Sequence, residues 1–307
     1  MSSPGGMRRS PTGRRRSECG NCENGSVSEN SHVNGVAQLS KHHGLGNDFL
    51  VWLTPELPVD PHELAQRWCD RRVGIGADGL LFGLPVRADA GADIEMRLHN
   101  SDGSPAEISG NGLRCFAQAV ARERGVDRLD LSVATAAGTR RCSTVPGPDV
   151  ATLIATVDMG VVTAGPPPVV DDLAAVVGAP MATVDRWETA DIGNPHVVCH
   201  VPDPARIDLA VAGPAIEAQF AGGVNVHFVS VTSADTLEMR VWERGAGITN
   251  ACGTGATVSA DVFHRWGLVG TRVRVRMPGG DAHVQLSGPL TLTGPATHVA
   301  DLLVPLP

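Results

Sequence analysis

Lysine is almost absent from this chain of 307 residues, since Lys41 is the single lysine among the 25 basic side chains. Pyridoxal-phosphate enzymes hold their cofactor on a lysine as a Schiff base, so such chemistry would depend on Lys41 alone. Aromatic residues are also scarce, at 4%, and the formal net charge is -8. A nucleic-acid partner requires a basic surface and rings that stack on bases. The composition therefore argues against a pyridoxal-phosphate enzyme and against nucleic-acid binding.

Long apolar runs and a secretion signal are missing as well. No run of about 18 apolar residues occurs, so we expect no membrane partner. The arginines within residues 8–16 are not followed by an apolar segment of signal-peptide length. The cysteines are odd in number and scattered, which favours reduced thiols in a cytoplasmic protein. They are Cys19, Cys22, Cys69, Cys115, Cys142, Cys199 and Cys252.

Residues 1–35 are rich in Ser, Gly, Asn and Arg and contain hardly any large apolar side chain. Such a segment cannot bury enough apolar surface to offset the entropy of ordering, so we expect a disordered tail. Cys19 and Cys22 form a Cys-x-x-Cys pair within it, but no second pair with zinc-finger spacing follows. A solvated tail is the favoured interpretation, and we predict no bound metal.

From about residue 36 onward, short runs rich in Val, Ile, Leu and Thr alternate with turns, a pattern typical of strands. Stretches with helical spacing are few. The mixture predicts an α/β or α+β protein. We predict helices at residues 61–69, 111–124, 171–177, 214–220 and 255–266.

The sequence also contains an internal repeat. Residues 95–98 (Glu-Met-Arg-Leu) lie 143 positions before residues 238–241 (Glu-Met-Arg-Val). The same offset relates residues 109–112 (Ser-Gly-Asn-Gly) to residues 252–255 (Cys-Gly-Thr-Gly), and it relates Asn100 to Glu243. Matches that fall on corresponding structural positions at one offset indicate a duplicated chain.

A further match, Gly46-Asn47 with Gly193-Asn194, has an offset of 147, as expected if a few residues were inserted between the blocks. Each half therefore has a strand, a loop and a Gly-x-Gly helix start in the same order. We expect the two helices to be buried, one in each half.

The two Gly-rich helix starts predict a carboxylate site. Their backbone N–H groups are not crowded by side chains, and the helix dipole adds partial positive charge at the same place. If the two starts converge, Ser109 and Cys252 face opposite sides of the α-carbon of one bound amino acid. The dipole is expected to lower the pKa of the Cys252 thiol and make it the general base.

The alternative for any cysteine is a buried structural residue. Cys252 does not fit it well, because a core cysteine seldom has Gly-rich flanks. For Cys69, Cys115, Cys142 and Cys199 this structural interpretation is preferred, since Cys115 lies within a predicted helix and the others lack an anion-binding context.

Several motifs occur in one order from about residue 40 to the carboxyl terminus, and together they resemble the diaminopimelate epimerase family. They are His-Gly-Leu-Gly-Asn-Asp-Phe (43–49), Cys-Asp-Arg-Arg (69–72), Gly-Ile-Gly-Ala-Asp-Gly (74–79), Asn-Ser-Asp-Gly (100–103), Gly-Asn-Pro-His (193–196), Glu-Arg-Gly-Ala-Gly (243–247) and Ala-Cys-Gly-Thr-Gly (251–255). The resemblance implies two pseudosymmetric α/β domains, each with strands wrapped around a central helix and with the active site between them. It also implies epimerisation of L,L-2,6-diaminopimelate to the meso isomer, a step toward lysine and peptidoglycan, without cofactor or metal.

The resemblance further implies domain limits and a partner. We expect halves at residues 36–155 and 156–296, with the last strand, about 297–307, joining the first half. Family members commonly form homodimers, so the resemblance implies a homodimer here.

Carried over by motif position, the resemblance also assigns roles to the polar residues. Cys252 corresponds to a catalytic thiol, and His196 and Glu243 correspond to groups that assist proton transfer. The backbone amides of Gly110, Asn111, Gly253 and Thr254 would bind the reacting carboxylate. The remaining substrate-binding positions are Asn47, Asn100, Asn194, Asn225 and Arg244. An arginine fork suits a distal carboxylate.

The pattern differs from the family at Ser109, where the family has cysteine. A hydroxyl ionises far less readily than a thiol, so Ser109 is a poor base unless a neighbour such as His196 removes its proton. Ile248 stands where the family commonly has an acidic residue, which is a milder departure because Glu243 and Arg244 remain. No G-x-S-x-G elbow surrounds Ser109, which argues against a serine hydrolase.

Three outcomes are open for a site with Ser109. The first is epimerisation with Ser109 or a water acting on one face. The second is one-base chemistry, as in an isomerase, racemase or dehydratase that acts on a related amino acid. The third is a catalytically weak paralogue that binds an amino acid. The first is favoured, because the substrate-binding positions match the family.

Overall fold

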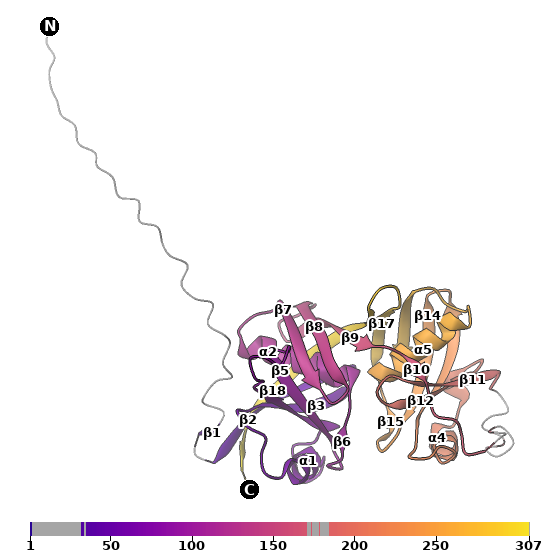
Figure 1. Cartoon of the computed structure of the whole chain (residues 1–307), viewed down its shortest axis with the longest axis horizontal. Helices are drawn as coiled ribbons and strands as arrows, with labels where there is room; N and C mark the ends of the chain where they lie inside the picture. Colours follow the sequence, from indigo (N-terminus) through magenta and orange to yellow (C-terminus); the bar gives the residue numbers. More distant parts are fainter. Residues whose placement is uncertain (2–31, 34, 171–172, 174–177, 179–183, 307) are drawn as a thin grey trace.

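The computed structural model describes residues 1, 32–33, 35–170, 173, 178 and 184–306. The chain forms two lobes that lie side by side, and the last strand, drawn in yellow, runs from the second lobe into the first (Figure 1). The helices are α1 (Pro61–Cys69), α2 (Gly110–Glu123), α4 (Leu209–Glu217) and α5 (Gly253–Arg265), with a short 3-10 helix η2 (Pro204–Arg206). Among the described residues, none of the helices combines the length and apolar character of a membrane span.

Eight strands of the first lobe form a closed barrel around α2. Their order is β2-β3-β4-β5-β7-β8-β9-β18, and β18 (Leu290–Pro305) closes the ring by pairing with β2. The strands of this lobe are β1 (His32–Val33), β2 (Val36–Gly44), β3 (Asn47–Leu53), β4 (Gly79–Leu84), β5 (Ile94–Asn100), β6 (Pro105–Ala106), β7 (Leu129–Thr135), β8 (Gly138–Pro146) and β9 (Thr152–Gly160).

The second lobe repeats the strand order and directions of the first. The sheet β11-β12-β13-β14-β16-β17-β18 surrounds α5. Its strands are β10 (Thr163–Ala164), β11 (Arg186–Asp191), β12 (Pro195–His200), β13 (Asn225–Ser233), β14 (Thr236–Glu243), β15 (Gly247–Thr249), β16 (Arg272–Met277), β17 (Gly280–Gln285) and β18 (Leu290–Pro305).

The strand registers confirm the predicted duplication. The parallel pair β3 and β4 aligns Phe49 with Gly79, and the parallel pair β12 and β13 aligns His196 with Asn225 in the same way. In each lobe the next strand is antiparallel and the one after it parallel. The predicted fold class, with strands wrapped around a central helix in each of two similar domains, is therefore confirmed.

The central helices are enclosed on all sides along most of their length. Every residue from 110 to 121 in α2 is buried, and so is every residue from 253 to 260 in α5. The Ser109 hydroxyl accepts from the Gly112 N–H at 3.0 Å and caps α2. Both helices begin within two residues of the predicted position.

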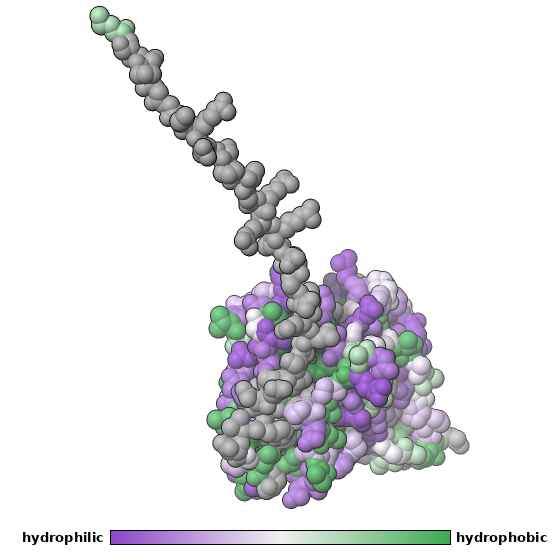
Figure 2. Space-filling model, turned by 60° about the vertical axis from the view of Figure 1, so that its left-hand side comes forward, coloured by the Kyte–Doolittle hydropathy of each residue, from purple (hydrophilic) through white to green (hydrophobic). Residues whose placement is uncertain are grey.

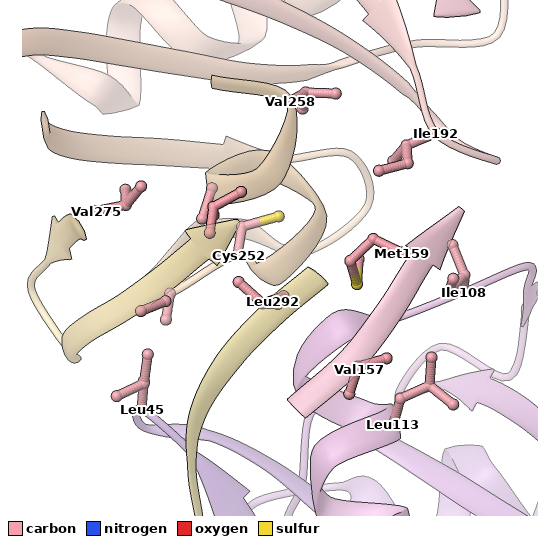
Figure 3. Packing of buried hydrophobic residues seen from close by; sticks show 14 of the residues in the cluster. Leu45, Ile108, Leu113, Val157, Met159, Ile192, Cys252, Val258, Val275 and Leu292 are labelled. Atoms are coloured by element: carbon pink, nitrogen blue, oxygen red, sulfur yellow. The ribbon is translucent and has the colours of Figure 1, made fainter. Parts of the chain in front are cut away.

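One hydrophobic core runs through both lobes, and Leu292 of β18 occupies its centre. It lies beside Cys252 of the second lobe and near Met159 of the first lobe (Figure 3). Because the core is continuous, the starts of α2 and α5 are held in a fixed relation to each other.

One predicted helix differs from the structure, and another cannot be compared with it. The helix predicted at 214–220 begins earlier, at Leu209, because the Asp208 carboxylate caps the Ala210 N–H at 3.2 Å. Pro214 therefore lies inside this helix rather than at its start. The predicted helix at 171–177 falls almost entirely outside the described residues. So does most of the predicted tail, although its described residues His32–Val33 pair with β2 as strand β1.

Candidate active site

The starts of α2 and α5 meet at two glycines. A Cβ atom added to Gly110 would lie 3.2 Å from the Cα of Gly253, and one added to Gly253 would lie 3.0 Å from the Cα of Gly110. Both added atoms would also come within 2.9 Å of Leu292. Only glycine allows this approach, which explains the first Gly of each Gly-x-Gly motif.

A cavity of about 320 Å³ lies where the two helix starts meet. Residues of both lobes line it, and Ser109 and Cys252 are among them. The other predicted site residues on its wall are Asn47, Asn100, Asn111, Asn194, Asn225, Glu243, Arg244, Gly253 and Thr254. Gly110 and His196 are predicted site residues that do not line it. The structure therefore brings the two candidate acid–base groups to one cavity.

Cys252 caps α5 and is almost fully buried, at 3% exposure. Its Sγ accepts from the Gly255 N–H at 3.4 Å and lies 3.5 Å from the Thr254 hydroxyl. Burial raises the pKa of the Cys252 thiol well above its usual range, and the Glu243 carboxylate beside it raises the pKa further. The prediction that the helix start lowers this pKa is therefore wrong, because desolvation and a neighbouring anion outweigh the dipole.

Glu243 is half-buried, and it accepts a hydrogen bond from the Thr249 hydroxyl. Desolvation raises the pKa of Glu243, while the Thr249 hydroxyl and the neighbouring Cys252 thiol oppose the shift. The thiol and the carboxyl group are thus neighbours in one site. A proton held between them titrates as a property of the pair.

Ser109 stands at the equivalent place in the first lobe. Among the described residues, the only hydrogen bond of its hydroxyl is the one it accepts from the Gly112 N–H. His196 makes no hydrogen bond to Ser109. Both ring nitrogens of His196 are hydrogen-bonded within the second lobe, one to Asn194 and one to His227. The expected activation of Ser109 by His196 is therefore not seen in the structure.

A buried network of side chains joins the two lobes behind the cavity. Arg114 donates to the Asn111 Oδ1 at 2.8 Å, and the Asn111 amide donates to the Asn47 Oδ1 and to the Ala251 carbonyl, both at 3.0 Å. Asn47 in turn donates to Asp78 at 2.6 Å. Asn111 thereby fixes the residue that precedes Cys252.

Sequence reasoning missed Arg114 and Asp78. Asp78 lies on the cavity wall. Its position in the Gly-Ile-Gly-Ala-Asp-Gly motif (74–79) could have indicated a role in the site. Arg114 is fully buried, and burial lowers its pKa to about 10. Nothing in the sequence around this arginine indicates that its side chain is buried.

The cavity wall also carries a charged pair. Arg244 lies 3.9 Å from Glu107 of the first lobe, so the pair crosses between the lobes. The Arg244 backbone N–H donates to the Asn225 Oδ1 at 3.0 Å, and the Asn225 amide donates to the Pro195 carbonyl at 3.0 Å. A cation and an anion on the cavity wall offer partners for a second charged group of a ligand.

The other described cysteines are free and buried, and none of them lines this cavity. Burial is the main cause that raises the pKa of each to about 12; they are Cys69, Cys115, Cys142 and Cys199. Their predicted structural role is confirmed. Cys19 and Cys22 lie outside the described residues.

The same fold occurs in several solved structures. A hydroxyproline epimerase from Agrobacterium vitis matches with a TM-score of 0.64 and 16% identity, over 88% of this chain and 93% of that chain. A predicted epimerase from Pseudomonas aeruginosa matches with a TM-score of 0.65 and 17% identity, over 86% and 98%. At these identities the likeness establishes the fold alone.

Sequence relatives define the family more narrowly. The model of the diaminopimelate epimerase family matches residues 39–164 and 189–299. A diaminopimelate epimerase from Synechococcus elongatus is 40% identical over 275 residues, which is 85% of this chain and 96% of that protein. One from Desulforudis audaxviator is 40% identical over 277 residues, which is 86% and 98%. The chain belongs to the diaminopimelate epimerase family and is an isomerase.

Proposed function

We propose that this protein converts L,L-2,6-diaminopimelate to meso-diaminopimelate without a cofactor, by removing the α-proton from one face and returning a proton to the other. The reaction is a step in lysine biosynthesis and supplies a peptidoglycan precursor. The observation that carries the proposal is that Ser109 and Cys252 cap two helices whose starts meet at one cavity.

The reacting carboxylate binds between the helix starts. The backbone amides of Gly110 and Asn111 and those of Gly253 and Thr254 belong to the first turns, where N–H groups have no partner within the helix. Two helix dipoles add positive charge there. Removal of the α-proton moves negative charge onto this carboxylate, so donors already in place stabilise the transition state more than the ground state.

The Cys252 face carries the stronger base. Its raised pKa means that the thiol is mainly protonated in the empty site and delivers a proton to the α-carbon in one direction of the reaction. In the other direction the thiolate takes the α-proton, after Glu243 has accepted the thiol proton. The family resemblance implies that His196 assists proton transfer. Its side chain does not line the cavity, and it is hydrogen-bonded to Asn194, which does.

The Ser109 face differs from the Cys252 face. Its hydroxyl has no basic group in hydrogen-bond contact among the described residues, so it acts as a proton donor or relays a proton to a water. This chemistry is slower than thiol chemistry. The second candidate function, one-base exchange at the Cys252 face of a related amino acid, is favoured by the same asymmetry.

The distal amino-acid end of the substrate binds across the cavity. Arg244 binds its carboxylate, and the asparagine side chains Asn47, Asn100, Asn194 and Asn225 hydrogen-bond its remaining polar groups. All five line the cavity. An amino acid without a second charged end would leave Arg244 without a ligand partner.

We further propose the two domains, the partner and the compartment. Pairing of β18 with β2 along Thr297–Pro305 supports a first domain that starts at residue 36 and is joined by the last strand. Strand β9 belongs to this domain as far as Gly160, so we propose that the second domain begins after Gly160 rather than at residue 156. Free thiols at every described cysteine support a cytoplasmic site of action. A homodimer is proposed from the family resemblance, and the mixed polar and apolar surface in Figure 2 offers both kinds of contact.

Incubation with L,L-diaminopimelate in heavy water tests the function. We expect the meso isomer to form and to carry deuterium at the inverted α-carbon, as measured by chiral chromatography and mass spectrometry. The Cys252→Ala variant should lose both signals. Exchange without inversion would support the one-base alternative, and binding without exchange would support an amino-acid-binding protein.

A further inference from the structure

Two buried histidines form a polar chain that leads away from the cavity wall in the second lobe. The His196 Nε2 lies 2.8 Å from the Asn194 Oδ1, and the His196 Nδ1 lies 2.8 Å from the His227 Nε2. The rings stack with centroids 5.0 Å apart, and both side chains are fully buried. Among the described residues, the His227 Nδ1 has no hydrogen-bond partner.

This arrangement fixes where each proton lies. The Asn194 Oδ1 can only accept, so the His196 Nε2 must carry a hydrogen. Burial lowers the pKa of both rings, that of His227 to about 3, so both rings are neutral near pH 7. The His196 Nδ1 then accepts from the His227 Nε2–H, and the unpartnered nitrogen is a bare acceptor. A buried N–H without a partner would be costlier, which favours the same polarity.

The first lobe has no such chain at the equivalent positions. Strand register equates His196 with Phe49 and His227 with Leu81. In the second lobe the His227 ring fills the space beside Gly255, where an added Cβ would lie 2.2 Å from the ring. The polar chain is therefore built into the Cys252 half of the duplicated fold alone.

We propose that His227 is a positioning residue for the reaction described above. Through His196 it holds the Asn194 carboxamide with Oδ1 turned to the histidine and Nδ2 available to an acceptor on the bound amino acid. Because both ring nitrogens of His196 are engaged, His196 orients Asn194 and does not itself receive the α-proton. The inference rests on the proposed function for its role in catalysis, whereas the proton positions do not depend on it.

Nitrogen NMR of protein labelled with 15N-histidine tests the proton positions without substrate. At pH 7 we expect neutral rings with hydrogen on Nε2 for both His196 and His227, assigned by the signals that disappear in the His196→Gln and His227→Gln variants. Hydrogen on the His196 Nδ1, or a charged ring at either position, would overturn the inference whatever reaction the protein catalyses.

Kinetics with L,L-diaminopimelate test the positioning role. His227→Leu copies the first lobe and removes the donor to His196, so we expect KM to rise about tenfold, the effect of one lost hydrogen bond, with a smaller change in kcat. His227→Gln keeps an N–H donor and should restore most of the affinity. The matched control is His42→Leu, which removes a buried and hydrogen-bonded histidine remote from the cavity.

The control separates positioning from stability. We expect His42→Leu to lower the free energy of unfolding and to leave KM unchanged. If His227→Leu, checked for folding by circular dichroism, also leaves KM unchanged, the positioning role is wrong. If the unaltered protein does not act on diaminopimelate, the proposed function fails while the NMR result still decides the proton positions.

Discussion

Ser109 and Cys252 have the same structural task but different chemistry. Both accept a hydrogen bond from the N–H three residues later, at 3.0 Å for the hydroxyl and 3.4 Å for the sulfur. Serine is among the preferred residues at a helix N-cap, so the serine retains the structural part of the role fully. Ser109 lacks a side chain that ionises readily near neutral pH. We therefore expect proton transfer at the Ser109 face to be slower than at the Cys252 face.

Replacing Ser109 by cysteine should therefore raise the rate of epimerisation. A thiol is a far better acid–base catalyst near neutral pH, and a positioned group of this kind contributes about a hundredfold or more. We expect kcat to increase by at least about tenfold in a chiral assay with L,L-diaminopimelate. An unchanged kcat would contradict the view that the hydroxyl limits turnover.

The charge of Glu243 affects the ionisation of the Cys252 thiol. Its carboxylate is the largest cause, after burial, of the raised pKa of the thiol. Neutralising it in Glu243→Gln should lower the pKa of Cys252, because the thiolate no longer faces an anion. The pH at which iodoacetamide labels Cys252 half-maximally, measured by mass spectrometry, should then shift downward. Cys142, whose pKa burial raises to about 12, serves as the unshifted control in the same digest.

At the scale of elements, the contact between α2 and α5 decides whether the two caps share one cavity. Gly110→Ala should force the helix starts apart, since the new Cβ would meet both Gly253 and Leu292. We expect a loss of about 1–3 kcal/mol in the free energy of unfolding and a large loss of activity. Gly270→Ala is the control, because its nearest contact would be an ordinary 3.8 Å. Equal urea midpoints and activities for the two variants would contradict this account.

The elements also show what the sequence could predict. The repeat at offset 143 located both central helices and placed Ser109 and Cys252 at equivalent positions, because glycine spacing and strand pattern are local features. The predicted start of α4 is too late, because the helix begins after the Asp208 cap and Pro214 lies inside it. The ionisation of Cys252 was predicted in the wrong direction, because burial depends on packing by residues far away in the sequence. His227 was missed for the same reason.

At the scale of the whole molecule, burial of neutral histidines makes stability depend on pH. Burial lowers the pKa of His42 to about 4, whereas the unfolded chain binds this proton near pH 6.5. Stability is therefore lost as the pH falls from 6.5 toward 4, by about 2 kcal/mol at pH 5 for one such residue. In His42→Leu, the drop in unfolding free energy between pH 7 and pH 5 should be smaller by this amount, as measured by urea unfolding. Identical drops in both proteins would contradict the prediction.

The central claim for the whole molecule is that two lobes present two different acid–base groups to opposite faces of one α-carbon. The most direct measurement is the position of deuterium early in the reaction of L,L-diaminopimelate in heavy water. Two-face chemistry predicts that the meso product carries solvent deuterium while recovered substrate remains unlabelled. Labelled substrate together with product that retains the original proton would show that a single group serves both faces, and would contradict the account.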